Sequence, residues 1–427
     1  MNKKLDFSRP LMVLAPLAGY TDLPFRSVVK KFGADLTISE MISSNALVYK
    51  SARTLKTIEK SPTEDPYFVQ IAGNSVELVR DAVLILNEVE GIDGIDLNCG
   101  CPAPKVFNHG SGSNLLGDLK KLDFSRPLMV LAPLAGYTDL PFRSVVKKFG
   151  ADLTISEMIS SNALVYKSAR TLKMIEKSPS EDPYFVQIAG NSVELVRDAV
   201  LLLNEVEGID GIDLNCGCPA PKVFNHGSGS NLLGDLKKLE EILSTVKKYS
   251  KKQYTSAKVR IGVNDKIPVD IGKAVEACGV DFVSVHGRTR AGKYKAPVDY
   301  DAIKAMKEAI SIPVIANGDI KDYDKAKEVL KYTNADGVMI GRGAIGKPWV
   351  FYQLKHGVDN ISEEMKKEII LEHFDAMLKF HGPHGAIMFR KLLHSYSKGY
   401  TGANEFRDIV NKISDIDVMR DIIDNFF

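Results

Sequence analysis

From residue 128 onward, short runs of apolar residues alternate with amphipathic segments of about 10–15 residues. This alternation is typical of βαβ units and a parallel sheet. In the segment 192–206, Ser192 can cap a helix and Glu194 lies in the first turn, where a negative charge is favourable. The pattern predicts eight strands, at 129–134, 153–158, 184–189, 210–215, 256–261, 281–286, 312–317 and 336–341.

Eight strand–helix units in succession are typical of an α/β protein with a (β/α)8 fold, the TIM barrel. A doubly wound sheet is the alternative reading of the same pattern. Beyond Pro348 the strand signals stop, and residues 360–427 predict helices only, with a break near Gly382. We therefore expect a barrel over 120–355 and a small C-terminal helical domain over 356–427.

The first part of the chain repeats itself almost letter for letter. Residues 3–122 reappear as residues 120–239, at an offset of 117. Repeat architectures have units of about 20–50 residues and at least three of them, so this long duplication is not one. We interpret residues 1–119 as a duplicated half-barrel segment with strands one to four only. The copies differ at three aligned positions: Thr57/Met174, Thr63/Ser180 and Ile85/Leu202.

Both copies of the half barrel fit the same partner, the strands five to eight that follow residue 239. Copy two reaches strand five through a short connection, whereas copy one would need a connection longer by 117 residues. Loop-closure entropy grows with the logarithm of loop length and favours copy two by about 2 kcal/mol. We expect residues 120–427 to fold as the working unit. Copy one, with two open sheet edges, would be loosely folded, self-associated or bound to another chain.

Composition describes an ordinary soluble globular protein, with 44% hydrophobic and 26% charged residues. The formal net charge of +2 is no overall signal for nucleic acid, although a local basic surface stays open. No apolar run reaches the about 18 residues of a membrane span, so we expect no membrane association. The cysteines form neither a disulfide framework nor a cluster with histidines that predicts a metal site, and they favour a reducing cytoplasm. They are Cys99, Cys101, Cys216, Cys218 and Cys278.

The unusual polar and small residues of the predicted barrel fall where its strands end. The carboxyl ends of the strands form the functional face of a TIM barrel. Strand four ends in Asn215 and Cys218, and strand five carries Lys258 in an apolar run, where an uncompensated charge is costly. The other strand ends supply Pro133, Leu134 and Ala135; Gln187; His286, Arg288 and Arg290; Asn317, Gly318 and Asp319; and Gly341 and Arg342.

This ordered set of motifs closely resembles the tRNA-dihydrouridine synthases, and looks nearest to their bacterial B-type branch. The resemblance covers about residues 125–427, and copy one matches its own first half. This sequence departs from the pattern of the family at two positions. Cys216 stands where relatives often carry Met, and Ser230 stands where Ala is commoner. The matching motifs are Ala-Pro-Leu-Ala-Gly-Tyr-Thr-Asp (132–139), Asn-Cys-Gly-Cys-Pro (215–219), His-Gly-Arg-Thr-Arg (286–290), Asn-Gly-Asp (317–319) and Gly-Arg-Gly (341–343).

The resemblance implies an FMN-dependent barrel that reduces a uridine in tRNA to 5,6-dihydrouridine, with NADPH as the reductant. Cys218 would give the proton to C5 of the base, and reduced FMN would give hydride to C6. Asn215, Arg288 and Arg290 would meet the substrate, and the helical tail would help to hold the tRNA. The residues implied to bind FMN are Pro133, Leu134, Ala135, Gln187, Lys258, His286, Asn317, Gly318, Asp319, Gly341 and Arg342.

The residue types by themselves leave plainer interpretations open. A cysteine is often only a small buried apolar residue, and a lysine at a strand end can reach solvent. Arg288 and Arg290 could form surface salt bridges. Gly341–Gly346 is weak evidence for a nucleotide site when taken alone, although barrels often bind phosphate after strands seven and eight. The glycine-rich segment 227–230 predicts a mobile substrate loop.

Two other functions fit the same sequence. One is a flavin-dependent barrel that acts on a free pyrimidine, and the other is a catalytically disabled RNA-binding protein. Copy one repeats Gln70, Asn98 and Cys101 without the later strands, so we expect it to be catalytically silent. We expect a monomer, with self-association through the extra half barrel as the alternative.

Overall fold

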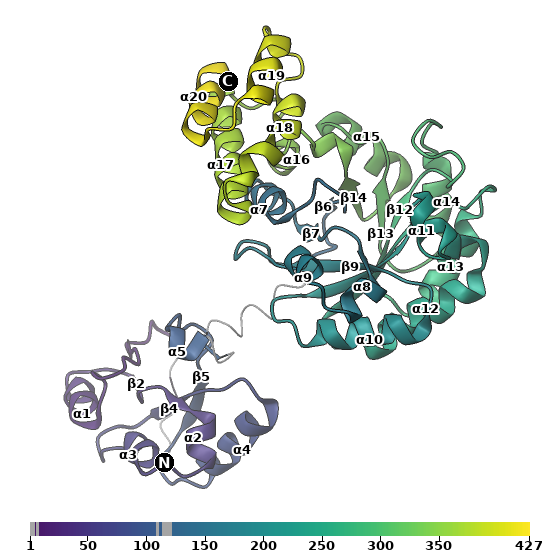
Figure 1. The fold of residues 1–427 in the computed structure, drawn as a ribbon. Coiled ribbons are helices and arrows are strands. Elements are labelled where there is room, and N and C mark those ends of the chain that lie inside the picture. Colours follow the sequence, from purple (N-terminus) through teal and green to yellow (C-terminus); the bar gives the residue numbers. More distant parts are fainter. Residues whose placement is uncertain (1–4, 6–7, 108–110, 113–121) are drawn as a thin grey trace. The chain divides into compact units, whose positions relative to one another are not determined.

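The computed structural model describes residue 5 and residues 8–107, 111–112 and 122–427. The chain forms two compact units, residues 1–121 and residues 122–427 (Figure 1). The predicted boundary between residues 119 and 120 lies outside the described residues. Among the described helices, none combines the length and the apolar character needed to cross a membrane.

Eight parallel strands close into a barrel in the second unit, as predicted (Figure 1). The ladder closes because β14 pairs with β6 and β10 pairs with both β9 and β11. All eight predicted strands are confirmed, with ends displaced by a few residues. They are β6 (Leu128–Leu131), β7 (Leu153–Ile155), β9 (Tyr184–Ala189), β10 (Gly211–Cys216), β11 (Tyr254–Arg260), β12 (Phe282–His286), β13 (Val314–Asn317) and β14 (Gly337–Ile340), with the short β8 (Ile159–Ser160) beside β9.

Helices surround the barrel, and their ends follow local capping chemistry. The hydroxyl of Ser192 accepts a hydrogen bond from the backbone N–H of Leu195, which fixes the start of α10 at Val193 as the sequence predicts. The helical elements are α7 (Leu140–Lys148), α8 (Ser161–Val165), α9 (Ala169–Met174), α10 (Val193–Asn204), α11 (Pro221–Asn225), α12 (Leu236–Tyr249), α13 (Pro268–Ala277), α14 (Tyr300–Ala309), α15 (Tyr323–Thr333) and α16 (Val350–His356), with 3-10 turns η1 (Gly229–Gly234) and η2 (Arg342–Ala344).

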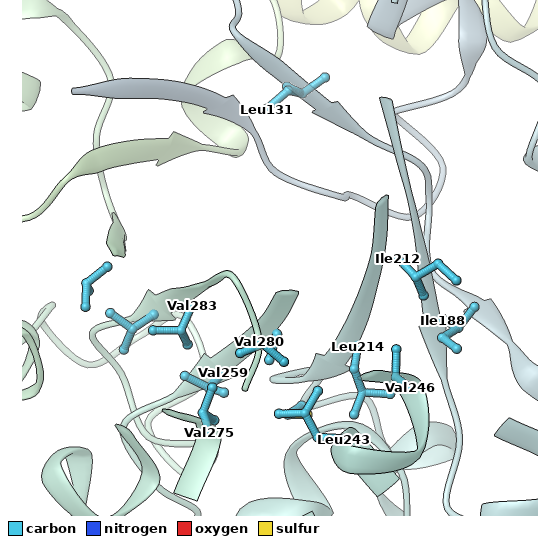
Figure 2. Close-up of a cluster of buried hydrophobic side chains, with 14 of the residues drawn as sticks. Leu131, Ile188, Ile212, Leu214, Leu243, Val246, Val259, Val275, Val280 and Val283 are labelled. Carbon is cyan, nitrogen blue, oxygen red and sulfur yellow. The ribbon is translucent and has the colours of Figure 1, made fainter. Parts of the chain in front are cut away.

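The main core lies between the strands and the helices outside them. Leu214 of β10 packs in one cluster with Leu243 and Val246 of α12, and all three side chains are fully buried (Figure 2). Complete burial of one such side chain contributes roughly 1.5–3 kcal/mol to the free energy of unfolding. This packing therefore holds the helices against the strands. A second cluster fills the barrel itself and contains Val130, Phe185, Phe282, Ile315 and Met339.

The C-terminal region is helical, as predicted. The predicted boundary between residues 355 and 356 falls at the end of α16. The expected break is at Gly382, whose φ of 65° ends the first long helix. The rings of Phe142 in α7 and His373 lie 5.3 Å apart, so this region packs on the barrel beside α7. Its helices are α17 (Glu363–His381), α18 (His384–Tyr396), α19 (Ala403–Lys412) and α20 (Ile416–Phe426).

The first unit contains the same first four barrel strands as an open sheet. Among the described residues, its outer strands β1 and β5 each pair on one side only. In the second unit, strand five of the barrel, β11, pairs with β10 of copy two. The elements are β1 (Val13–Leu14), α1 (Leu23–Lys31), β2 (Leu36–Ile38), β3 (Ile42–Ser43), α2 (Ser44–Val48), α3 (Ala52–Thr57), β4 (Tyr67–Ala72), α4 (Val76–Asn87), β5 (Gly94–Leu97) and α5 (Pro104–Phe107).

Identical residues differ in burial between the two copies. Val13 in the open sheet is 46% exposed, whereas its counterpart Val130 in the closed barrel is fully buried. Phe25 in α1 is 45% exposed, whereas Phe142 in α7 is fully buried beneath the C-terminal helices. The missing partners, and not the local sequence, therefore account for the apolar surface of the first unit.

Candidate active site

A cavity of about 1730 Å³ opens at the carboxyl ends of the barrel strands. Small-molecule cavities usually measure about 300–1,000 Å³, so this one has room for more than one ligand. The C-terminal region forms part of the same wall through Lys366, Tyr396, Lys398 and Tyr400. The cavity therefore lies between the barrel and the helical region, in the place where TIM-barrel sites are built.

Thirteen of the fifteen candidate residues line this cavity. They come from β9, β10, β11, β12 and β13 and from the segments that follow β6, β10, β13 and β14, so the closed barrel brings together residues from seven strands. They are Pro133, Leu134, Ala135, Gln187, Asn215, Cys218, Lys258, His286, Asn317, Gly318, Asp319, Gly341 and Arg342.

Arg288 and Arg290 are not among the lining residues. The guanidinium of Arg288 is buried and forms a two-bond ion pair with Asp319, at 2.5 and 3.1 Å. The guanidinium of Arg290 lies 3.7 Å from the ring centroid of Phe224 in α11. In this arrangement both arginines contact protein groups beside the cavity.

Cys218 is held at the cavity by its own main chain. Its backbone N–H donates to Oδ1 of Asn215 at 2.9 Å, and its carbonyl oxygen accepts from the hydroxyl of Ser230 at 2.8 Å. A Cβ on Gly229 would lie 3.0 Å from that carbonyl oxygen and 3.1 Å from the Cβ of Cys218, so Gly229 allows the close approach. The thiol is partly exposed and free of any disulfide.

The segment 227–230, which the sequence predicts to be a mobile substrate loop, is packed into the structure in its second half. Gly229 and Ser230 begin the 3-10 turn η1 and are buried, and Ser230 is hydrogen-bonded to Cys218. Buried backbone needs internal partners, and the backbone N–H of Ser230 donates to the carbonyl oxygen of Cys218 at 3.2 Å. Ser230 thus adds a side-chain hydrogen bond to the main chain of Cys218.

Lys258 brings a positive charge to the floor of the cavity. Its ammonium group donates to Oδ1 of Asn317 at 3.0 Å, and Asn317 in turn donates to the carbonyl oxygen of Met339 at 2.7 Å. Burial, with a smaller contribution from Arg260, lowers the pKa of Lys258 to about 8. Within the described residues no carboxylate forms a salt bridge with Lys258, so an anionic ligand would compensate its charge.

His286 is neutral in this site. Burial and then the positive charges around it, Lys258 first, lower its pKa to about 2. Nη1 of Arg288 lies 3.3 Å from Nε2 of His286, and because a guanidinium can only donate, Nε2 accepts. The ring proton then lies on Nδ1, so His286 can offer an N–H to a ligand but does not act as a charged acid.

Asp319 joins the two predicted binding segments after β13 and β14. Its carboxylate accepts from Arg288 and, at 3.0 Å, from Nη2 of Arg342. The guanidinium of Arg342 also lies 4.6 Å from the ring centroid of Tyr294. The lining of the cavity as a whole carries eight lysine or arginine residues and four aspartate or glutamate residues, which favours anionic ligands.

Asp213 was not among the candidates, although it lies directly beneath them. It is fully buried in β10 and accepts from Nε2 of Gln187 and from the hydroxyl of Ser256, at 2.6 Å each. The sequence signal was present, since a carboxylate stands inside the apolar run 211–216. Arg260 and Tyr294 also line the cavity and were not predicted as site residues.

The remaining cysteines do not form a second site. Cys216 is fully buried in the core, and burial raises the pKa of its thiol well above the usual range. Cys278 belongs to the same core cluster. Over the described ranges, no group of three or more histidine, cysteine or acidic residues could hold a metal ion.

The sequence profile described as dihydrouridine synthase matches this chain over residues 13–123 and 130–426. Most of each copy of the half barrel therefore falls within a matched segment. A Helicobacter pylori protein described as a probable tRNA-dihydrouridine synthase is 52% identical over 308 residues, which are 72% of this chain and 94% of that protein. The tRNA-dihydrouridine synthase B of Vibrio parahaemolyticus is 39% identical over 308 residues, with 70% and 95% coverage.

Solved structures with a similar arrangement are more distant. TcOYE with pHBA has a TM-score of 0.41 and 9% identity, and the alignment covers 56% of this chain and 91% of that one. A morphinone reductase variant in complex with tetrahydroNAD has a TM-score of 0.42 and 12% identity, with 56% and 89% coverage.

Proposed function

The chain belongs to the dihydrouridine synthase family, and on this premise we propose that its second unit binds FMN and reduces a uridine of tRNA to 5,6-dihydrouridine, with NADPH as the reductant. The observation that carries the proposal is the position of Cys218, an accessible thiol that lines the same cavity as the half-buried cation Lys258. A proton donor for one atom of a base and a site for an anionic redox group are thus brought together.

The residues present fit FMN. Lys258 is a half-buried cation without a salt-bridge partner among the described residues, and it suits a ring system that gains negative charge on reduction. The segments after β13 and β14, with Gly318, Gly341 and Arg342, suit a phosphate group, as such loops do in many barrels. Pro133, Leu134 and Ala135 offer an apolar wall. When bound, FMN would supply the hydride that C6 of the uracil accepts.

The chain's own residues supply the rest of the reaction. Cys218 donates its thiol proton to C5 of the base, so one hydride and one proton saturate the C5–C6 bond. Neutral His286 donates an N–H to the ligand through Nδ1, and Asn215 contacts the base. The apolar wall and the helical region exclude water from the reacting atoms, which strengthens these polar contacts.

The tRNA would lie over the mouth of the cavity. Lys366, Lys398 and Tyr400 of the helical region line it, so cations and an aromatic ring face a substrate with a phosphate backbone. The described contacts of Arg288 and Arg290 instead favour a supporting role, and their contact with tRNA stays a prediction. The five free cysteines agree with a reducing compartment, and we keep the cytoplasm as the expected location.

The first unit contributes no reaction in this proposal. Cys101, Gln70 and Asn98 repeat the residues of the site, but the lysine, histidine and phosphate segments occur only after residue 239. The open sheet could pair with another chain or stay unpaired, and a monomer remains the expected state.

The first experiment is the visible absorption spectrum of the purified full-length chain, from which the flavin per polypeptide is calculated. About one FMN per chain supports one complete barrel. Unmodified tRNA transcripts and NADPH are then added, and dihydrouridine is measured. Flavin with activity on free uracil alone would favour a pyrimidine reductase, and tRNA binding without flavin would favour a disabled RNA-binding protein.

A further inference from the structure

A chain of hydrogen bonds runs from beneath the cavity to the main chain of Cys218. Asp213 accepts from Nε2 of Gln187 at 2.6 Å, and Oε1 of Gln187 accepts from Nδ2 of Asn215 at 2.8 Å. Oδ1 of Asn215 accepts from the backbone N–H groups of Gly217, at 3.2 Å, and Cys218, at 2.9 Å. Asp213 is fully buried and lies outside the lining of the cavity, so it can act only through the other residues.

The two ends of this chain determine the direction of every bond in it. A carboxylate can only accept, so the NH2 group of Gln187 must face Asp213. Backbone N–H groups can only donate, so the oxygen of Asn215 must face Gly217 and Cys218. The amide groups of Gln187 and Asn215 are nearly symmetric in shape and could otherwise turn by 180°. With both ends in place, a turn of either amide would bring two donors or two acceptors together.

This arrangement decides what Asn215 can offer to a ligand. Its oxygen already accepts two hydrogen bonds, and one of its two amide hydrogens is used by Gln187. The remaining group on this cavity-lining side chain is one N–H donor. Its complement is a carbonyl oxygen, such as those of uracil or of a flavin ring, and an exocyclic amino group would be rejected.

The same chain of bonds is present in the first unit, where strands five to eight are missing. Asp96 accepts from Gln70 at 2.6 Å, Gln70 accepts from Asn98 at 2.9 Å, and Asn98 accepts from the N–H of Cys101 at 2.9 Å. The network is therefore formed by two neighbouring strands and their loop. In the second unit, Ser256 of β11 adds a further donor to the carboxylate.

We propose that Asp213 is a positioning residue, which anchors Gln187 and thereby holds the amide of Asn215 and the main chain of Cys218 in the orientation that the reaction needs. The proposal rests on the proposed function. If Asp213 were absent, the buried NH2 group of Gln187 would lack an acceptor, and burying an unsatisfied amide is costly. Gln187 would then turn toward the water of the cavity and release Asn215.

The test uses three variants of the full-length chain. Asp213→Leu removes the acceptor and keeps the branching at Cγ, whereas Asp213→Asn keeps the volume and an acceptor for Gln187 and can donate to the hydroxyl of Ser256. Asp96→Leu makes the same change in the first unit and is the matched control. Flavin per chain, the shape of the flavin spectrum, kcat and KM on tRNA transcripts, and the melting temperature are measured for each.

For Asp213→Leu we expect bound FMN, an altered flavin spectrum and a kcat lowered by about 10²-fold, since small displacements of reacting groups have effects of that order. Asp213→Asn should recover most of the turnover, and Asp96→Leu should match the parent. A folded Asp213→Leu variant with the kcat and the flavin spectrum of the parent would overturn the inference. An Asp213→Asn variant whose kcat is no higher than that of Asp213→Leu would also overturn it. A parent chain that binds FMN but never forms dihydrouridine would refute the proposed function alone, because the spectra of the variants would still test the role of Asp213.

Discussion

Nζ of Lys258 donates a 3.0 Å hydrogen bond to Oδ1 of Asn317, although the two residues belong to β11 and β13 and are 59 positions apart in the chain. Strand β12 lies between these two strands, so the contact crosses the carboxyl end of the barrel. It fixes a half-buried positive charge in the wall of the cavity, and no carboxylate among the described residues forms a salt bridge with it. The charge on Lys258 is thus available to a ligand.

The charge on Lys258 should appear in the pH dependence of catalysis. Because burial lowers its pKa to about 8, Lys258 loses its proton as the pH rises through 8, and flavin reduction and turnover should fall above that pH. The Lys258→Arg variant keeps its charge at high pH, so its activity, although lower, should not decline there. Rates of flavin reduction by NADPH from pH 6 to pH 10 would show this. A decline of the same shape in both proteins would assign it to another group.

The two copies of the cysteine allow a matched comparison. Cys218→Ala should lower turnover by about 10²–10⁴-fold, the usual contribution of a general acid, with FMN retained. Cys101→Ala should leave turnover unchanged, because its unit lacks the strands that carry Lys258 and His286. Both variants are assayed on the same tRNA transcript with equal flavin content. An active Cys218→Ala enzyme together with an inactive Cys101→Ala enzyme would reverse the assignment of the working copy.

His373 should make the stability of the second unit fall in acid. Its Nδ1 lies 2.8 Å from the hydroxyl of Tyr396, and burial lowers its pKa from 6.5 to about 4. Between these values the unfolded chain binds the proton and the folded chain does not. The contribution of neutral His373 to the free energy of unfolding is therefore fully present above pH 6.5. It is lost as the pH falls toward 4, which lowers the free energy of unfolding by up to about 3 kcal/mol.

This loss is measured by unfolding the parent and His373→Phe with denaturant at several pH values. The far-UV circular dichroism signal of the helices monitors the unfolding. The phenyl ring keeps the packing against Phe142 and Phe389 but cannot take up a proton. The difference in free energy of unfolding between the two proteins should therefore change with pH from 6.5 to 4 in favour of the variant. Parallel curves would rule out His373 as the source.

Limited proteolysis should separate the two units. The first unit leaves both sheet edges unpaired among its described residues and exposes Val13 and Phe25, which the second unit buries as Val130 and Phe142. Regions with fewer buried apolar contacts open more often and are cleaved first. We expect a protected fragment that contains residues 128–427 and retains FMN, identified by mass spectrometry. Equal protection of both units would indicate that the open sheet has found a partner.

The sequence alone determined the type of fold and most of the site. Apolar runs and amphipathic segments are local signals, so all eight strands, the cap at Ser192 and the helix break at Gly382 could be predicted from neighbouring residues. Parallel strands of a barrel end on the same face. For that reason, placing candidates at strand ends brought thirteen of fifteen residues to one cavity.

Only the tertiary structure decided the partners of those residues. The side chain of Arg288 meets Asp319, 31 positions later in the chain, and so it contacts protein beside the cavity instead of lining it. Val13 and Val130 have the same local sequence but opposite burial, because one lies in an open sheet and the other faces β14. Hydrogen-bond partners and burial depend on which distant strands close the barrel, and no local pattern contains that information.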